Sequence, residues 1–517
     1  MTVLPASDTR SAPAGTVTRA VGPTDATRPL DTTMVALSIG GRSVPATSRM
    51  PTNAFVAPDG WAATDPLGPS MNTMAVTRTP SRASVVFAAV FGVFAAFAVF
   101  AVLLFHMMDN NIVHVRRQPT LPVILAGSAA FLNLYETQPL LPLLTRTFHA
   151  STFQVGLTIT ATTVAVALTA PGIGRLADTI GLRRVIVGSA FLLSVATALA
   201  ATSSTLAQLV AWRFVQGVMT PGIFAGTVAY IHDMWPPSHT GRATAAYMTG
   251  SIVGGFTGRA LAGLIAADAN WHLSFATLGA IGFVLACVLL VWLPNERAAR
   301  PAATAARSAN RARRSSGPSA AAQLFHNRQL LTTYAIGFCV LFTNVAIFTY
   351  VTFHLAAPPF DLSTAALGWL FVVYLIGAVV TPFGGRWIDA YGHRAGLGSA
   401  MAISAAGALL TLAPSLFVIL AGLALSSTGV FIAQTTTSSY IGAVTTGDRG
   451  LAAGLYSTFY YTGGSVGAAA PAALWHLAGW PGCVALVVAV QCLGAAMAVT
   501  FWQSGPTHFD TSVEVGP

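Results

Sequence analysis

The sequence Gly174–Arg184 (GRLADTIGLRR) is a short polar segment between two long apolar runs. The stretch Gly385–Arg394 (GRWIDAYGHR) repeats its order Gly-Arg-x-x-Asp-x-x-Gly-x-Arg, again between apolar runs, and the interval from Gly174 to Gly385 is 211 positions. A pattern that recurs in two equivalent loops indicates an internal repeat. The sequence therefore predicts a chain of two similar halves.

Composition places most of the chain in a membrane. Of its 517 residues, 54% are hydrophobic and 8% are charged, with a mean hydropathy of +0.66, whereas a soluble domain carries about 25% charged residues. The net charge is +10 and all 26 basic residues are arginine, mostly in the N-terminal tail and in loops on one side of the predicted helices. This pattern favours orientation in a bilayer over a nucleic-acid partner, because no basic patch is interleaved with exposed aromatic residues.

The sequence contains no framework for a metal site, a cofactor or an enzyme. Its cysteines lie inside apolar runs without a Cys-x-x-Cys pair: Cys287, Cys339, Cys483 and Cys492. No His/Cys/Glu cluster has metal-ligand spacing, and there is no Walker A loop for ATP. No Ser/His/Asp or two-carboxylate constellation falls within the predicted helices. We therefore expect no catalytic residue, no metal and no cofactor.

The N-terminal region divides into two segments. Residues 1–83 are rich in Pro, Thr, Ala and Ser without an apolar period, and they predict a disordered tail. The apolar run at 84–107 is long enough to span a bilayer, which takes about 20 apolar residues. It is an extra span, an interfacial or re-entrant helix, or the result of a start-site error. We favour the error, with a true start at Met107 or Met108, because the leader then carries Arg116 and Arg117 on the cytoplasmic side.

Twelve further apolar segments each have the length of a membrane helix, at about 121–144, 154–172, 185–202, 206–231, 245–266, 274–293, 330–355, 366–383, 396–413, 415–443, 451–475 and 480–502. Arginines concentrate in the even-numbered loops, and the odd-numbered loops hold only Arg146. The even loops and both ends of the twelve-helix core are therefore predicted to be cytoplasmic. The predicted halves are 119–294 and 330–503, with a cytoplasmic linker at 295–329 and a cytoplasmic tail at 504–517.

The two repeated loops resemble the signature loop of the major facilitator superfamily, which lies between the second and third helices of each half. The match covers Gly174, Asp178, Gly181, Arg183 and Arg184 in the first copy, and Gly385, Asp389, Gly392 and Arg394 in the second. The resemblance extends over roughly residues 119–503. It implies an all-α membrane protein with twelve transmembrane helices in two six-helix repeats, the major facilitator fold, and the run at 84–107 would be an extra N-terminal helix. The loops are expected to act as latches between the halves, or else to supply turn chemistry with solvated charges.

Two charged residues of the predicted helices are candidates for proton coupling. Glu136 lies in the first helix, where a carboxylate at membrane depth is costly and is expected to face a wet cavity. Its alternative is an acid solvated at the outer mouth. Arg213, in the string RFVQG, resembles the second superfamily motif, whose arginine is implicated in proton coupling. Glu136 is its predicted counter-charge, and the alternative is a structural arginine bonded to backbone carbonyls.

The predicted fifth helix carries glycines four residues apart, which let helices approach closely: Gly250, Gly254 and Gly258, echoed by Gly463 and Gly467 in helix eleven. The stretch is similar to the antiporter motif of the superfamily, Gly-x-x-x-Gly-Pro-x-x-Gly-Gly. Gly255 replaces its proline and Arg259 its last glycine. We interpret Arg259 as a packing arginine paired inside its half, with attraction of an anionic substrate group as the alternative.

Polar and aromatic residues of the predicted helices are candidates to line a substrate cavity: Gln138, Asn344, Tyr350, Gln434 and Tyr460, and further Gln154, Thr158, Thr162, Thr349, Tyr374, Thr435, Tyr456 and Tyr461. The string Tyr-x-x-Gln-Pro-Leu-Leu-Pro at 135–142 resembles bacterial sugar and drug efflux permeases. The resemblance implies a secondary transporter working by alternating access, with proton-coupled efflux of a drug-like compound or sugar. An importer or uniporter of a small metabolite and a transport-dead membrane receptor are the alternatives. We expect a monomer in the bacterial inner membrane, whose partners are its substrate, protons and lipid.

Overall fold

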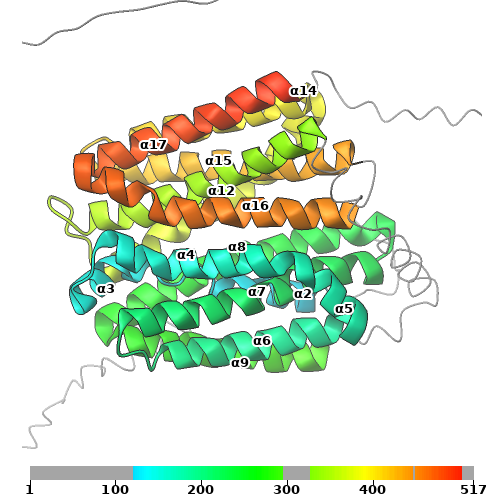
Figure 1. Ribbon diagram of the computed structural model, residues 1–517, viewed down its shortest axis with the longest axis horizontal. Coiled ribbons are helices and arrows are strands. Elements are labelled where there is room, and N and C mark those ends of the chain that lie inside the picture. Colours follow the sequence, from blue (N-terminus) through cyan, green and yellow to red (C-terminus); the bar gives the residue numbers. More distant parts are fainter. Residues whose placement is uncertain (1–119, 295–326, 446–448, 503–517) are drawn as a thin grey trace, which may run out of the picture. The chain divides into compact units, whose positions relative to one another are not determined.

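The computed structural model describes residues 120–294, 327–445 and 449–502, and all regular elements of these residues are helices (Figure 1). All described residues belong to one compact unit. The predicted tail at 1–83, the apolar run at 84–107, most of the linker and the tail at 504–517 lie outside the described residues. The prediction of an all-α membrane protein built from two six-helix repeats is confirmed.

The first half contains six spans, and two of them are interrupted. Its elements are α2 (Leu121–Leu132), η1 (Gln138–Leu140), α3 (Leu141–Phe148), α4 (Thr152–Thr169), η2 (Ala170–Gly172), α5 (Ile173–Ile180), α6 (Leu182–Ala200), α7 (Leu206–Met234), α8 (Pro237–Asp268) and α9 (Trp271–Trp292). The first span consists of α2, η1 and α3, and the second consists of α4, η2 and α5.

The second half repeats this order. Its elements are α12 (Arg328–Leu355), α13 (Thr364–Trp369), η4 (Leu370–Val372), α14 (Val373–Leu410), α15 (Leu416–Val444), α16 (Arg449–Ala469) and α17 (Pro471–Phe501). Gly392, at φ +82°, divides α14 into the eighth and ninth spans, and Gly479, at φ +62°, marks the start of the twelfth. The described residues therefore form twelve spans, six in each half.

The outer faces of the helices suit a lipid environment. Eight helices of the described part are long and apolar enough to cross a membrane. Large apolar side chains lie exposed on several of them, including Leu168, Val291, Phe417 and Leu477. In a soluble protein so many exposed apolar groups would be an aggregation hazard, but in a bilayer they contact lipid.

Glycines set the closest helix contacts inside each half. A Cβ atom at Gly250, Gly254 or Gly258 of α8 would collide with the backbone of α2, and one at Gly463 or Gly467 of α16 would collide with the backbone of α12. The first and fifth helices of both halves therefore pack backbone to backbone, as small residues permit in membranes.

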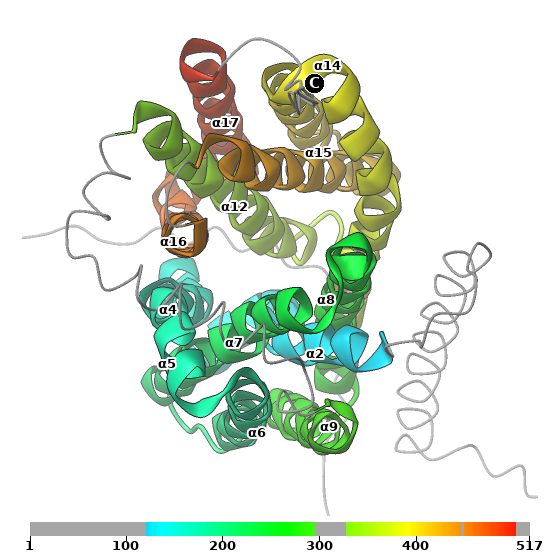
Figure 2. The ribbon, with the colours of Figure 1, turned by 90° about the vertical axis from the view of Figure 1, so that its right-hand side faces the viewer.

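The two halves meet along two helix pairs: α4 with α16, which are neighbours in Figure 2, and α8 with α13. Hydroxyl groups bridge the first pair: Thr160 Oγ1 donates to the Ser465 carbonyl at 3.1 Å, and Ser465 Oγ donates to Thr163 Oγ1 at 2.8 Å. Thr458 Oγ1 donates to the Ala167 carbonyl at 3.1 Å. The larger of the two cores contains side chains from both halves, so the middle of the described bundle is an interface between halves.

Candidate functional site

The first span is interrupted where it reaches the interface between halves. Residues 133–137 separate α2 from η1 and are not helical. Pro139 and Pro142 follow, and neither has an N–H group to donate to the preceding turn. Backbone carbonyls released by such a break need partners at membrane depth. Here Arg213 of α7 supplies them, because its Nη1 donates to the Asn133 carbonyl at 2.8 Å and its Nη2 to the Leu134 carbonyl at 2.7 Å.

Glu136, inside this break, pairs with the same arginine. Arg213 Nη1 lies 2.8 Å from Glu136 Oε1, and both side chains are 0% exposed. Gln216, one turn further along α7, donates from Nε2 to Glu136 Oε1 at 3.3 Å and accepts from Arg213 Nη1 at 2.6 Å. Arg213 Nε completes the set by donating to the Thr158 carbonyl of α4 at 3.2 Å. Five hydrogen bonds therefore fix this guanidinium among three spans of the first half.

The carboxyl group of Glu136 is bonded on one side only. Its Oε2 atom is buried and has no hydrogen-bond partner among the described residues, and the same holds for the Asn133 Oδ1 and Thr137 Oγ1 atoms of the break. A buried polar atom without a partner costs about 1–3 kcal/mol, and a charged one costs more. Each such atom in a native protein needs an explanation, and a functional role is one of those that are known.

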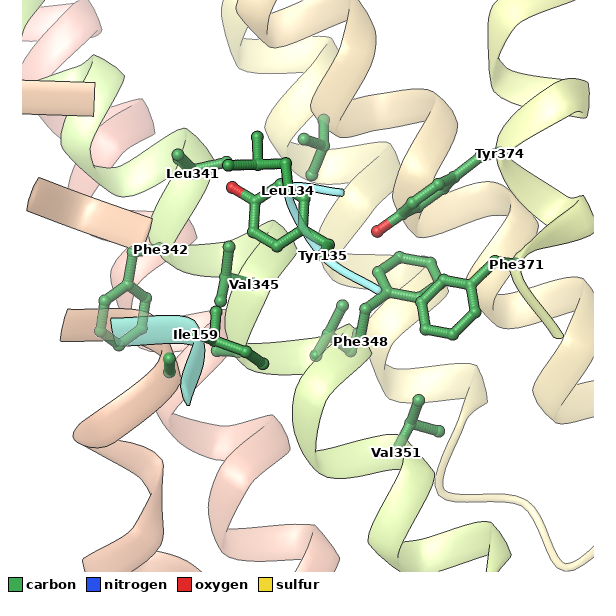
Figure 3. Close-up of a cluster of buried hydrophobic side chains, with 14 of the residues drawn as sticks. Leu134, Tyr135, Ile159, Leu341, Phe342, Val345, Phe348, Val351, Phe371 and Tyr374 are labelled. Carbon is green, nitrogen blue, oxygen red and sulfur yellow. The ribbon is translucent and has the colours of Figure 1, made fainter. Parts of the chain in front are cut away.

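Arg259 of α8 forms a second buried cluster. Its Nε donates to Gln138 Oε1 at 2.7 Å, and its Nη1 donates to the Gly255 carbonyl at 2.6 Å. The guanidinium carbon lies 5.0 Å from the ring centre of Tyr135, 4.8 Å from that of Phe371 and 5.2 Å from that of Tyr374. These three rings lie close together in Figure 3. The two hydrogen bonds stay inside the first half, whereas two of the rings come from the second half.

The predicted cavity residues separate into two groups. Gln138 accepts from Arg259 and donates to Thr349 Oγ1 at 3.4 Å across the two halves. Asn344 reaches this cluster through Tyr374, from whose hydroxyl it accepts at 3.4 Å. Tyr460 packs between Tyr456 and Tyr461 on α16, and Gln434 is partly buried on α15.

Tyr350 lies elsewhere, inside the second half. Its hydroxyl donates to the Ala468 carbonyl at 3.0 Å, and its ring packs on Phe353 and Trp475. Tyr135 and Phe371, whose rings lie over Arg259, are not among the cavity residues predicted from the sequence. Tyr135 adjoins Glu136 and could have been found for that reason, but Phe371 stands in an apolar run without any polar signal.

The two signature loops share one backbone feature. Gly181, at φ +92°, separates α5 from α6, and Gly392 has φ +82° at the matching place in the second half. Only glycine adopts such angles without strain. Arg183 donates from Nε to the Leu293 carbonyl at 2.7 Å and from Nη2 to the Leu290 carbonyl. It therefore caps the C-terminal end of α9, where the helix dipole favours a cation.

The other loop residues lie at the same ends of the spans. Gly174 and Asp178 belong to α5, Arg184 is exposed at the start of α6, and Arg394 is partly buried after Gly392. Gly385 and Asp389 fall in the part of α14 whose side chains lie outside the described residues. A contact between either loop and the opposite half thus stays a prediction.

Comparison with known proteins agrees with this architecture. The chain matches the family model described as Major Facilitator Superfamily over residues 123–363 and 355–512. It is 30% identical over 394 residues to the uncharacterized MFS-type transporter YybF of Bacillus subtilis, covering 76% of this chain and 93% of that protein. It is 30% identical over 377 residues to the inner membrane transport protein YnfM of Escherichia coli, covering 71% of this chain and 86% of that protein.

A solved structure shows the same fold. It is a bacterial homologue of the human lysosomal transporter Spinster, in an inward-facing and occupied conformation. The TM-score is 0.60 at 16% identity, over 75% of this chain and 96% of that one. At this identity the likeness concerns the fold alone.

Proposed function

Because the chain belongs to the major facilitator superfamily, we propose that its transport of a small molecule is coupled to protons at the pair formed by Glu136 and Arg213. A multi-pass membrane protein of this family carries out secondary transport, and two helical halves can rock about a site at their interface. The observation that carries the proposal is the buried pair itself, in which one carboxylate oxygen binds Arg213 and the other has no partner in the part of the chain that the structure describes.

Protonation of this carboxyl group has a direct structural consequence. A proton on Oε2 cancels the charge of Glu136 and weakens its bond to Arg213. The arginine then remains attached to the carbonyls of Asn133 and Leu134, inside the same helix break. Since Gln138, two residues after Glu136, bonds to Thr349 of the opposite half, a change in the break acts directly on the interface. A ligand shifts a conformational equilibrium only through such differential contacts.

The proposed direction is efflux, of a drug-like compound or a sugar, with proton antiport. Its support is the string at 135–142 and the Gly258-Arg259 ending of the fifth-helix motif, both similar to the efflux-permease branch. Import and uniport are the alternatives to proton-coupled efflux. We further propose a monomer in the bacterial inner membrane, with the even-numbered loops and both ends of the twelve-helix core in the cytoplasm, on the arginine distribution.

The test uses the full-length protein in proteoliposomes, with internal pH recorded while dyes, antibiotics and sugars are added. We expect a substrate-dependent pH change that disappears in Glu136→Gln, while substrate exchange between the two sides persists. Asp268→Asn is the matched control, because it removes an exposed carboxyl group at the end of α8. Substrate movement without any pH change would establish uniport or another coupling ion. Normal coupling in Glu136→Gln would remove Glu136 from the mechanism.

A further inference from the structure

The buried charges of the described residues do not balance. Three acidic or guanidinium side chains lie buried there: Glu136 at 1% exposure, Arg213 at 0% and Arg259 at 5%. Glu136 is hydrogen-bonded to Arg213 and Gln216 and forms its ion pair with Arg213. Arg259 forms no ion pair with any carboxylate in this part of the chain. A buried cation without an anion is costly. The excess positive charge at Arg259 therefore needs a functional or structural explanation.

The guanidinium of Arg259 retains capacity to bind. Arginine has five N–H donors in a planar fork that fits a carboxylate with two parallel bonds. Hydrogen bonds to Gln138 and Gly255 use Nε and Nη1, which leaves Nη2 without a protein acceptor in the described structure. The hydroxyl of Tyr135, whose ring lies over the guanidinium, is buried and has no hydrogen-bond partner among the described residues. The free Nη2 group can therefore donate to an oxygen of an anionic ligand.

The walls around these donors are aromatic. Tyr135, Phe371 and Tyr374 each place a ring about 5 Å from the guanidinium carbon of Arg259. Cation–π contacts of this kind hold the guanidinium in place and exclude water. A lone cation surrounded by rings selects a ligand that carries a single negative charge on an apolar or aromatic body. A phosphate dianion would need more donors than this site presents.

We propose that Arg259 and its three rings form the binding site for the carboxylate end of the transported molecule, so that the substrate is an organic anion. This rests on the proposed transport function and names its substrate class. The rings come from both halves and Gln138 joins Arg259 to Thr349 of the second half. An anion bound there contacts the two parts that must move relative to each other.

The test compares carboxylates with their uncharged amides. Thermal unfolding of the purified full-length protein is followed by tryptophan fluorescence with benzoate, phenylacetate, benzamide or phenylacetamide present, since a ligand of the folded state raises Tm. The carboxylates are expected to raise Tm and the amides are not. Arg259→Gln should weaken carboxylate binding about tenfold to a hundredfold, the loss expected for charge-assisted hydrogen bonds. Arg328→Gln, which removes an exposed guanidinium at the start of α12, should leave it unchanged.

A second variant keeps the test decisive if Arg259→Gln does not fold. Arg259→Lys retains the charge but loses the planar fork, so carboxylates should bind more weakly than in the parent protein and still better than amides. Equal Tm shifts for carboxylates and amides, or unchanged shifts in both Arg259 variants, would overturn the proposal.

Failure of this proposal is separable from failure of proton coupling. Glu136→Gln should still bind the carboxylates while losing the substrate-dependent pH change. Carboxylate binding without any pH change would contradict the coupling alone, and a pH change driven only by uncharged compounds would contradict the anion site alone.

Discussion

Removal of Arg213 should destabilise the protein far more than removal of its partner Glu136. In Arg213→Met the Glu136 charge loses its ion pair, and the carbonyls of Asn133, Leu134 and Thr158 lose their donor. Five hydrogen bonds at about 0.6 kcal/mol each, an average measured in a membrane protein, amount to about 3 kcal/mol. Breaking a buried pair from one side costs about 3–5 kcal/mol, so the two independent estimates agree.

Glu136→Gln is the milder change. An amide keeps an oxygen that can accept from Arg213, and the three backbone carbonyls keep their donors. We expect a loss of about 1–2 kcal/mol, from the charge-assisted part of one hydrogen bond. The double variant should then be more stable than Arg213→Met alone, because no unpaired carboxylate remains buried.

The assay is a double-mutant cycle on unfolding free energies in mixed detergent micelles. The predicted interaction energy between the two sites is about 1–3 kcal/mol, within the range seen for residues of one buried network. Additive losses, with the double variant less stable than the parent protein by the full sum of the two single losses, would refute the arrangement described for this pair.

Three further changes test the packing that surrounds the site. Gly254→Ala should cost at least about 1–3 kcal/mol, because its Cβ meets the backbone of α2, whereas Gly188→Ala faces open space and should leave the Tm unchanged or higher. Ser465→Ala removes a hydrogen bond between α16 and α4 that contributes about 0.6 kcal/mol. It should therefore raise about threefold the fraction of molecules in which these two helices are separated. Spin-label distances check this, with Thr462→Ala as the exposed control on the same helix; identical distance distributions would contradict it. Arg183→Gln should lower stability by about 0.5–1.5 kcal/mol in thermal unfolding, because the C-terminal carbonyls of α9 lose their donor.

The sequence was sufficient to predict the architecture, because the signals that decide it are local. Apolar length predicts a span, and the repeated loop predicts two halves. Gly181 and Gly392 occupy matching turns with positive φ. Such a turn requires glycine, and that glycine stands at a fixed place in the repeated sequence motif. The first span was predicted as one helix at 121–144, and the structure shows a break at residues 133–137. Pro139 and Pro142 signal that break locally, but the donors that stabilise it, Arg213 and Gln216, come from α7.

The surroundings of Arg259 could not be predicted from the sequence in the same way. We expected a packing arginine paired inside its half. Its hydrogen bonds do stay there, but Phe371 and Tyr374 of the second half cover the guanidinium. No spacing rule joins α8 to η4 and α14, because the contact depends on how the halves meet. The lack of a counter-charge at Arg259 likewise depends on three-dimensional neighbours, because the buried carboxylate of Glu136 pairs with Arg213 instead.

One short segment of the first span contacts both the proposed proton site at Glu136 and Arg213 and the proposed anion site at Arg259. The carbonyls of Asn133 and Leu134 bond to Arg213, and Glu136 forms its ion pair with the same arginine. From the same break, the ring of Tyr135 lies over Arg259, and Gln138 bonds to Arg259 and to the second half. Coupling between two ligands requires an element whose conformation both of them bias. A proton at Glu136 and an anion at Arg259 would both act on residues 133–138, so this broken turn of the first span meets that requirement without a longer chain of contacts.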